Sequence, residues 1–89
     1  MSYNYKIERP KLFTEEGQVL FLKIRDRAHE LLKIAGAFRQ GEVLKGISGD
    51  NWTMMACLDR MIELGELEEL DRDCWAQFTV YSTPQKHNL

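Results

Sequence analysis

The most regular hydrophobic pattern in this chain predicts an amphipathic α-helix that begins after Thr14 and ends at Gly36. Between these two residues, apolar side chains recur every three or four positions, which places them on one face of a helix. They are Leu20, Phe21, Ile24, Ala28, Leu31, Leu32 and Ala35. The Thr14 side chain can cap the first turn, and a glycine such as Gly36 is typical of the position that follows a helix.

Two further helices are predicted in the next part of the chain. Residues 40–47 have apolar side chains at helical spacing and predict a helix of about two turns. The third predicted helix begins near Ser48 or Asp50, either of which can cap it, and ends before Gly65. Its apolar stripe is Met54, Leu58, Met61 and Leu64. Its outward face is Trp52, Thr53, Ala56, Asp59, Arg60 and Glu63.

Past the third helix, the apolar period shortens to two residues, which is the period of a β-strand. Residues 66–70 and 75–81 therefore predict a β-hairpin with its turn at residues 71–73. In the second strand we expect the face with Phe78 and Val80 to be the core face, whereas the face with Trp75 and Tyr81 either covers the first helix or lies exposed. The expected core is Leu20, Ile24, Leu31, Leu44, Leu58, Met61, Leu67 and Phe78.

The beginning of the chain alternates apolar and polar side chains at Tyr3, Tyr5 and Ile7, which is typical of a strand or an extended arm. The chain has 89 residues, of which 44% are hydrophobic and 29% are charged. That is enough for one small domain, and too apolar for a wholly disordered chain. The expected organisation is an N-terminal arm or strand (1–13), a folded domain (14–82) and a flexible tail (83–89).

Several classes of protein are disfavoured by the sequence. No apolar run approaches the roughly 18 residues that cross a bilayer, and the N-terminus lacks the apolar stretch of a secretory signal, so we expect a cytoplasmic protein with no membrane partner. Two cysteines, Cys57 and Cys74, are too few for a disulfide scaffold. His29 and His87 have no metal-ligand spacing, and no phosphate-binding loop or nucleophile elbow occurs. We therefore expect no catalytic residue, no cofactor and no metal site.

The order of the predicted elements resembles that of the winged helix-turn-helix superfamily over about residues 14–82. Residues 57–67 look like the end of that superfamily's third helix running through a glycine into the wing, and residues 71–73 look like the wing tip. The resemblance implies an α+β fold, a three-helix winged-helix-like domain with a C-terminal β-hairpin wing. It also implies a third helix that enters the major groove of DNA, with Thr53 and Arg60 as DNA-binding residues, and a wing that contacts backbone phosphates, with Arg72 as its DNA-binding residue.

Charge is distributed unevenly along the chain. Residues 1–47 hold nine basic and six acidic residues, a net charge of +3. Residues 48–73 hold two basic and eight acidic residues, a net charge of −6. DNA binding depends on basic side chains that neutralise phosphates, and the predicted third helix and hairpin carry the opposite sign. Charge therefore disfavours nucleic acid as the partner.

We accordingly expect a small non-enzymatic protein-interaction or regulatory module that docks through its acidic third helix and hairpin. The residues expected to bind the partner are Trp52, Asp59, Glu63, Glu68, Glu69 and Asp71. Trp52 is either an exposed anchor for that partner or a residue that packs on the hairpin.

The expected partner is another protein or a second copy of this chain, as in a homodimer. In a homodimer, the first helix would offer the acidic hairpin a basic surface made of Arg25, Arg27 and Lys33. The alternative is a DNA-binding transcriptional regulator of the winged-helix type. Such a regulator would use the first helix and basic N-terminal residues, which are Lys6, Arg9 and Lys11.

Overall fold

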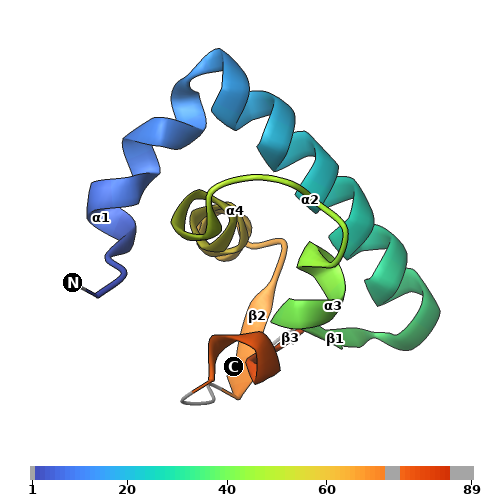
Figure 1. Ribbon diagram of the computed structural model, residues 1–89. Coiled ribbons are helices and arrows are strands. Elements are labelled where there is room, and N and C mark those ends of the chain that lie inside the picture. The colour runs from blue at the N-terminus through green and yellow to red at the C-terminus, as the bar shows by residue number, and fades with distance from the viewer. Residues whose placement is uncertain (1, 72–74, 85–89) are drawn as a thin grey trace.

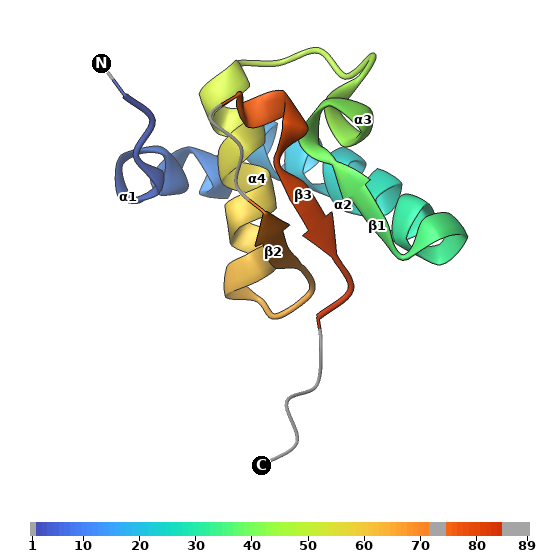
Figure 2. The same cartoon turned by 90° about the horizontal axis from the view of Figure 1, so that it is seen from below.

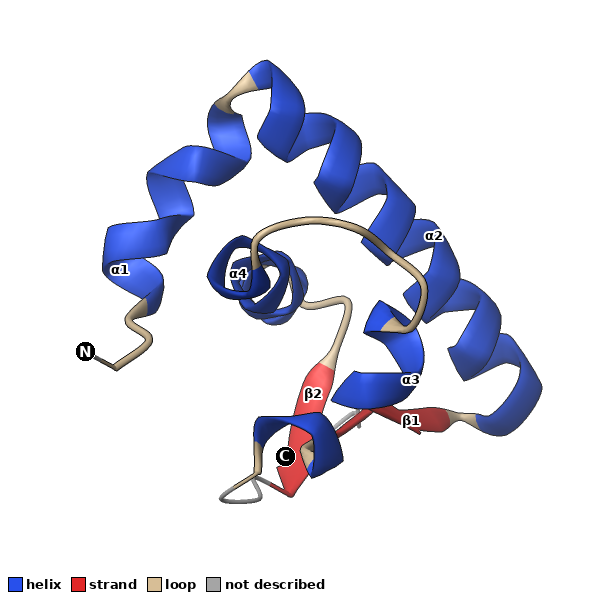
Figure 3. Ribbon diagram, in the orientation of Figure 1, coloured by secondary structure: helices blue, strands red, loops and turns tan. Residues whose placement is uncertain are grey.

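The computed structural model of the protein describes residues 2–71 and 75–84. They form an α+β fold of helices and a small three-stranded antiparallel sheet, which lies at one end of the helical part (Figures 1 and 3). In chain order the elements are α1 (Tyr5–Glu8), the 3-10 helix η1 (Arg9–Phe13), α2 (Glu15–Ala35), β1 (Ala37–Arg39), α3 (Gln40–Leu44), α4 (Asn51–Glu63), β2 (Glu68–Asp71), the 3-10 helix η2 (Ala76–Phe78) and β3 (Val80–Ser82). Among the described residues, no helix is long and apolar enough to cross a membrane.

Helix α2 forms where the sequence predicts it. The Thr14 hydroxyl accepts a hydrogen bond from the Gly17 amide and so caps the first turn. At the other end Gly36 adopts a left-handed φ of 76°, and its amide donates to the Leu32 carbonyl. A residue with a Cβ would be strained at that φ, which explains the glycine. The predicted start and stop of this helix are confirmed.

Among the described residues, helix α4 contributes five of the thirteen buried hydrophobic side chains of the core. Of the two predicted caps, Asp50 is the one that forms, and its carboxylate accepts from the Thr53 amide. Met54, Leu58 and Met61 are at most 5% exposed and pack in the same core as α2 residues. Viewed along α4, Figure 1 shows α2 on one side of this helix and the N-terminal helical segment on the other.

The sheet has the strand order β1-β3-β2, so that β3 is the central strand. Tyr81 of β3 lies opposite Phe38 of β1 and Glu69 of β2. The rings of Phe38 and Tyr81 stack with centroids 5.7 Å apart, and both side chains are 3% exposed. Figure 2 looks onto the sheet with α2 and α4 behind it. The sheet therefore closes the core through the Phe38–Tyr81 pair.

The second half of the predicted hairpin differs from the structure. Ala76–Phe78 is a turn of 3-10 helix, and the strand begins only at Val80. Because this turn replaces extended backbone, the expected alternation of faces fails: Phe78 is 44% exposed, and Tyr81 takes the core position instead. Gly41 permits this arrangement, since a Cβ there would lie 3.2 Å from the Gln77 carbonyl oxygen. Placing Phe78 in the core was wrong.

Other core and boundary predictions hold in part. Ile24, Leu58, Met61 and Leu67 are buried as expected. Leu20, Leu31 and Leu44 are only partly buried and pack against the core. Helix α3 ends at Leu44, earlier than the predicted end at residue 47. The predicted turn at residues 71–73 and the predicted tail lie largely outside the described residues.

The N-terminal segment is helical and not a strand or an extended arm. The Asn4 side chain accepts from the Lys6 amide, and the Asn4 carbonyl accepts from the Ile7 and Glu8 amides. Ile7 is 67% exposed, whereas Leu12 is 1% exposed in the core. The alternation of residues 3–7 therefore does not mark two faces of a strand, because Ile7 points away from the body of the protein.

Candidate functional site

The outward side of α4 is occupied by residues 3–13, which we call the N-terminal cover. The Tyr3 hydroxyl donates to Oδ2 of Asp59 at 2.5 Å, and the Tyr5 hydroxyl donates to Oε1 of Glu63 at 2.9 Å. Arg9 Nε donates to both Glu63 carboxylate oxygens, at 3.0 and 3.2 Å. These bonds join positions more than 50 residues apart in the chain, and they fix the cover across α4.

Two arginines complete this polar cluster. Arg60 Nη1 donates to Glu63 Oε1 at 2.6 Å, so one carboxylate receives Arg9, Arg60 and Tyr5 together. The guanidinium groups of Arg9 and Arg60 lie 4.9 and 5.3 Å from the centroid of the Phe13 ring. Both distances are within the range of cation–π attraction. Glu63 and Phe13 therefore hold the two arginines at the junction between the cover and α4.

The electrostatics of the cluster follow from these contacts. The hydrogen bonds from Arg60, Arg9 and Tyr5 lower the pKa of Glu63 to about 2. Burial and the bond to Glu63 raise the pKa of Tyr5 to about 12. Burial, followed by the bond to Asp59, raises the pKa of Tyr3 well above its ordinary value. The cluster is thus most favourable with ionised carboxylates and neutral tyrosines, which is its state near neutral pH.

The residues of α4 that were expected to face outward and bind a partner or DNA have different environments in the structure. Asp59 and Glu63, expected to bind a partner, both bind tyrosines of the N-terminal cover. Thr53 bonds through its hydroxyl to Asp50, and Arg60 bonds to Glu63. Ala56 is 0% exposed, so its assignment to an outward face of the third helix was wrong. That side of α4 is in contact with the cover, which local periodicity could not reveal.

Trp52 lies elsewhere, in a groove of about 500 Å³ between α3, the start of α4 and η2, which we call the tryptophan groove. Trp75 lines the same groove and is 67% exposed. Met55 and Ile47, both partly exposed, add apolar surface to it. Trp75 was not among the predicted binding residues, because its place beside Trp52 depends on the packing of η2 against α3.

The predicted acidic residues beyond α4 lie on β2, at one edge of the sheet. Glu68 and Glu69 are partly buried, and Asp71 is exposed. Acidic side chains on an edge strand disfavour edge-to-edge pairing between molecules. Arg72, the third predicted DNA-binding residue, lies outside the described residues.

The basic surface expected on the first helix is partly used within the molecule. Arg25 donates to the Glu66 carboxylate through Nε at 2.7 Å and Nη2 at 3.0 Å, and His29 Nε2 lies 3.0 Å from the same group. Burial tends to raise the pKa of Glu66, but the bonds from Arg25 and His29 outweigh it and lower that pKa. Arg25 is therefore less suited to receive the acidic hairpin of a second copy.

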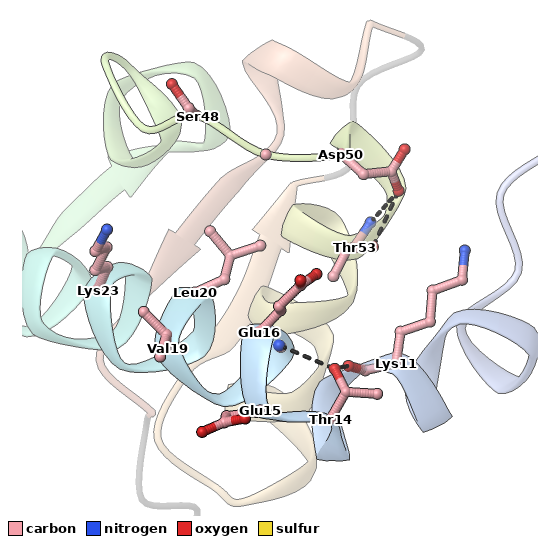
Figure 4. A pocket seen from close by; sticks show the side chains of 12 residues that line it. Lys11, Thr14, Glu15, Glu16, Val19, Leu20, Lys23, Ser48, Asp50 and Thr53 are labelled. Carbon is pink, nitrogen blue, oxygen red and sulfur yellow. Dashed lines mark hydrogen bonds between the residues drawn. The ribbon is translucent and has the colours of Figure 1, made fainter.

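A second groove, of about 760 Å³, lies where the first turns of α2 and α4 meet (Figure 4). Both capping groups, Thr14 and Asp50, are bonded to their own helices there. Lys11 and Lys23 line the groove together with acidic side chains of α2, so its charge is mixed. The groove therefore presents no concentrated charge of one sign for a ligand to recognise.

Within residues 2–71 and 75–84, no three His, Cys, Asp or Glu side chains are grouped so that they could hold a metal ion. Cys57 is buried, and burial raises its pKa to about 12, so its thiol stays protonated near neutral pH. Cys57 is therefore poorly suited to act as a nucleophile.

Neither protein-family models, nor curated proteins, nor solved structures give a match to the chain.

Proposed function

We propose that this protein is a small non-enzymatic interaction module on a winged-helix-type scaffold. The order helix, strand, helix, helix, strand, strand, with the last strand between the other two, resembles the topology of winged-helix domains. In such a scaffold α2, α3 and α4 take the places of the three helices, and β2 and β3 take the place of the wing.

The N-terminal cover argues against DNA binding through α4. In winged-helix proteins that bind DNA, the outward side of the third helix enters the major groove. Here the corresponding side contacts α1 and η1, and its carboxylates Asp59 and Glu63 would repel phosphate. Arg60 is bonded to Glu63 and lies over Phe13, so it is not oriented towards an external base.

The observation that carries the proposal is that the chain brings its two tryptophans together in one groove. Tryptophan is enriched at the energetic centres of protein interfaces, and exposed apolar grooves commonly mark binding sites. Among the described residues that line the groove, the charged one is Lys45. The acidic strand β2 lies outside this lining and ends at Asp71, four positions before Trp75 in the sequence. The partner that fits these features is a protein segment with a large apolar anchor flanked by basic side chains.

A peptide-display selection against the full chain tests this proposal. We expect selected peptides to combine an aromatic or aliphatic anchor with lysine or arginine, and to lose at least tenfold in affinity against Trp75→Ala, as expected when an anchor of roughly 1.4 kcal/mol or more is removed. The matched control is Ile7→Ala, because Ile7 and Trp75 are both 67% exposed but lie on different parts of the surface. Equal loss with both variants would contradict the proposal.

The alternative function, winged-helix DNA binding, has its own test. Binding of random-sequence duplex DNA near 0.15 M salt, with affinity that falls steeply as salt rises, would support a DNA-binding regulator. Loss of that binding in Arg60→Ala would place the contact on α4. We expect no such binding, because α4 and β2 present acidic side chains.

A further inference from the structure

We propose that the outward side of α4 is a second docking site, which recognises a basic, tyrosine-bearing protein segment, and that residues 3–9 are its internal occupant. These residues are called the α1 segment below. The inference does not depend on the tryptophan groove, because α1 and α4 meet through a different set of residues.

The α1 segment shows which chemistry this side of α4 accepts. It holds two basic residues, Lys6 and Arg9, against one acidic residue, Glu8. Its two tyrosine hydroxyls donate to two carboxylates of α4, and its arginine donates to one of them. Hydrogen bonds to ionised acceptors are among the stronger and more directional ones in proteins. A partner segment with the same groups would satisfy the same carboxylates.

The α1 segment is suited to leave this site. Its helix has four residues, which is too short to be stable without tertiary contacts. Ile7 is 67% exposed, so the segment contributes little apolar burial through that side chain. The Glu8 side chain is 4% exposed and bonds to Lys11 Nζ at 2.6 Å, so lifting the segment returns a buried carboxylate to water.

Residues 11–13 stay in place when the segment leaves. Leu12 is 1% exposed in the core. A Cβ at Gly17 would lie 1.9 Å from the Lys11 carbonyl oxygen and 2.8 Å from the Leu12 Cα, so the backbone of η1 lies directly on the first turn of α2. The pivot is therefore at residues 9–10, between the anchored part of the cover and the α1 segment.

Two double variants distinguish the role of the α1 segment from the role of the α4 surface that it occupies. Tyr3→Phe with Tyr5→Phe removes both hydroxyls from the α1 segment and leaves α4 unchanged. Asp59→Asn with Glu63→Gln also loosens the segment, but it alters the docking surface itself. The probe is an acetylated and amidated peptide with the sequence of residues 2–10, and its control is a scrambled peptide of the same composition.

Binding is followed by amide chemical shifts of the isotope-labelled full chain. A site that is closed most of the time weakens apparent affinity by its open fraction, so we expect the tyrosine double variant to bind the peptide about tenfold more tightly than the wild type. We expect the carboxylate double variant to bind the peptide no better than the scrambled control.

Several results would overturn the inference. Equal affinity of the wild type and the tyrosine double variant would show that the segment does not compete, and tight binding by the carboxylate double variant would show that Asp59 and Glu63 do not form the site. If circular dichroism shows that a double variant is unfolded, Tyr5→Phe and Glu63→Gln are compared singly, with the same expected order. Salt-sensitive binding of duplex DNA by the tyrosine double variant would assign this side of α4 to nucleic acid instead.

Discussion

Helix α4 is covered on two sides by two different kinds of interaction. Its inner side packs against α2 through side chains such as Leu58 and Met61, which are fully buried in an apolar core. Its outer side meets the N-terminal cover through two tyrosine hydroxyls and one arginine that donate to Asp59 and Glu63. The inner side depends on apolar burial. On the outer side, Leu12 of η1 is also buried in the core, but the contact of α1 depends mainly on hydrogen bonds and charge.

The difference between the two sides predicts different responses to conditions. Apolar burial changes little with pH, and it sets the global stability of a small domain. Polar contacts near the surface contribute less and depend on ionisation and salt. We therefore expect the inner contact to fail only with the whole fold, and the outer contact to open locally.

The largest effect is expected on the inner side. Leu58→Ala removes a fully buried leucine and should lower the free energy of unfolding by about 2–5 kcal/mol. Urea unfolding followed by circular dichroism measures this change. A loss close to zero would mean that α4 does not carry the core, and the comparison of its two sides would fail.

A smaller effect is expected at the base of the N-terminal cover. Alanine is the better helix former, but Gly17→Ala places a Cβ against backbone atoms of Lys11 and Leu12. Overpacking of this kind costs about 1–3 kcal/mol, so we expect a net loss of stability. The control is Glu16→Ala, at the exposed neighbouring position. Stabilisation by Gly17→Ala would show that η1 moves away freely.

Sequence patterns predicted the elements whose signals are local. The caps Thr14 and Asp50 and the stop at Gly36 are confirmed, because capping depends on residues within one turn of a helix. Which of Phe78 and Tyr81 is buried could not be predicted in this way, because it depends on how η2 packs against α3. Contacts between residues far apart in the chain therefore determine which of these two side chains enters the core.

The candidate site was predictable to a similar extent. Asp59 and Glu63 were correctly placed on the outer side of a helix, but their bonds to Tyr3 and Tyr5 join residues 56 and 58 positions apart. Charge gave a usable signal: the N-terminus is basic and the third helix is acidic. That signal indicates attraction between the two, and it could have suggested that they meet within one chain.

On the outer side, Tyr3→Phe removes one hydroxyl and keeps the ring. The lost hydrogen bond to Asp59 should favour local opening of α1 by about 1 kcal/mol, the usual net value for such a bond. Hydrogen exchange of the Ile7 and Glu8 amides, which bond to the Asn4 carbonyl, measures this opening. Unchanged exchange at these amides would show that the hydroxyl does not hold the cover.

The contact between α1 and the outer side of α4 should also weaken at both acidic and alkaline pH. The pKa of Glu63 is lowered to about 2 from an ordinary 4.5, so its contribution is complete above pH 4.5 and is lost as pH falls towards 2. The pKa of Tyr5 is raised to about 12 from an ordinary 10, so its contribution is complete below pH 10 and is lost as pH rises towards 12.

Amide hydrogen exchange measures this pH dependence. The exchange rates of α1 are compared with those of the Leu58 and Met61 amides across this pH range, after correction for intrinsic rates. We expect protection of α1 to be highest between about pH 4.5 and 10 and to decrease outside that window, relative to protection of α4. Parallel changes in both helices would mean that the outer contact opens only with the whole fold.

The smallest effect is expected on β2, which belongs to neither side of α4. Replacing Glu68, Glu69 and Asp71 together with Gln, Gln and Asn relieves repulsion between like charges on one short edge strand, so stability should change by no more than about 0.5 kcal/mol.

Sedimentation of the wild type and of this triple variant at low and high salt tests whether the chain associates with itself. Because Arg25 is already bonded to Glu66, we expect both proteins to be monomeric at either salt concentration. A dimer that forms only in the wild type at low salt would revive docking between two copies, since only the acidic strand and screening differ between these samples. Unfolding of the triple variant would instead show that these carboxylates are structural. The proposal that the acidic strand β2 attracts the basic side chains of a partner would then be wrong.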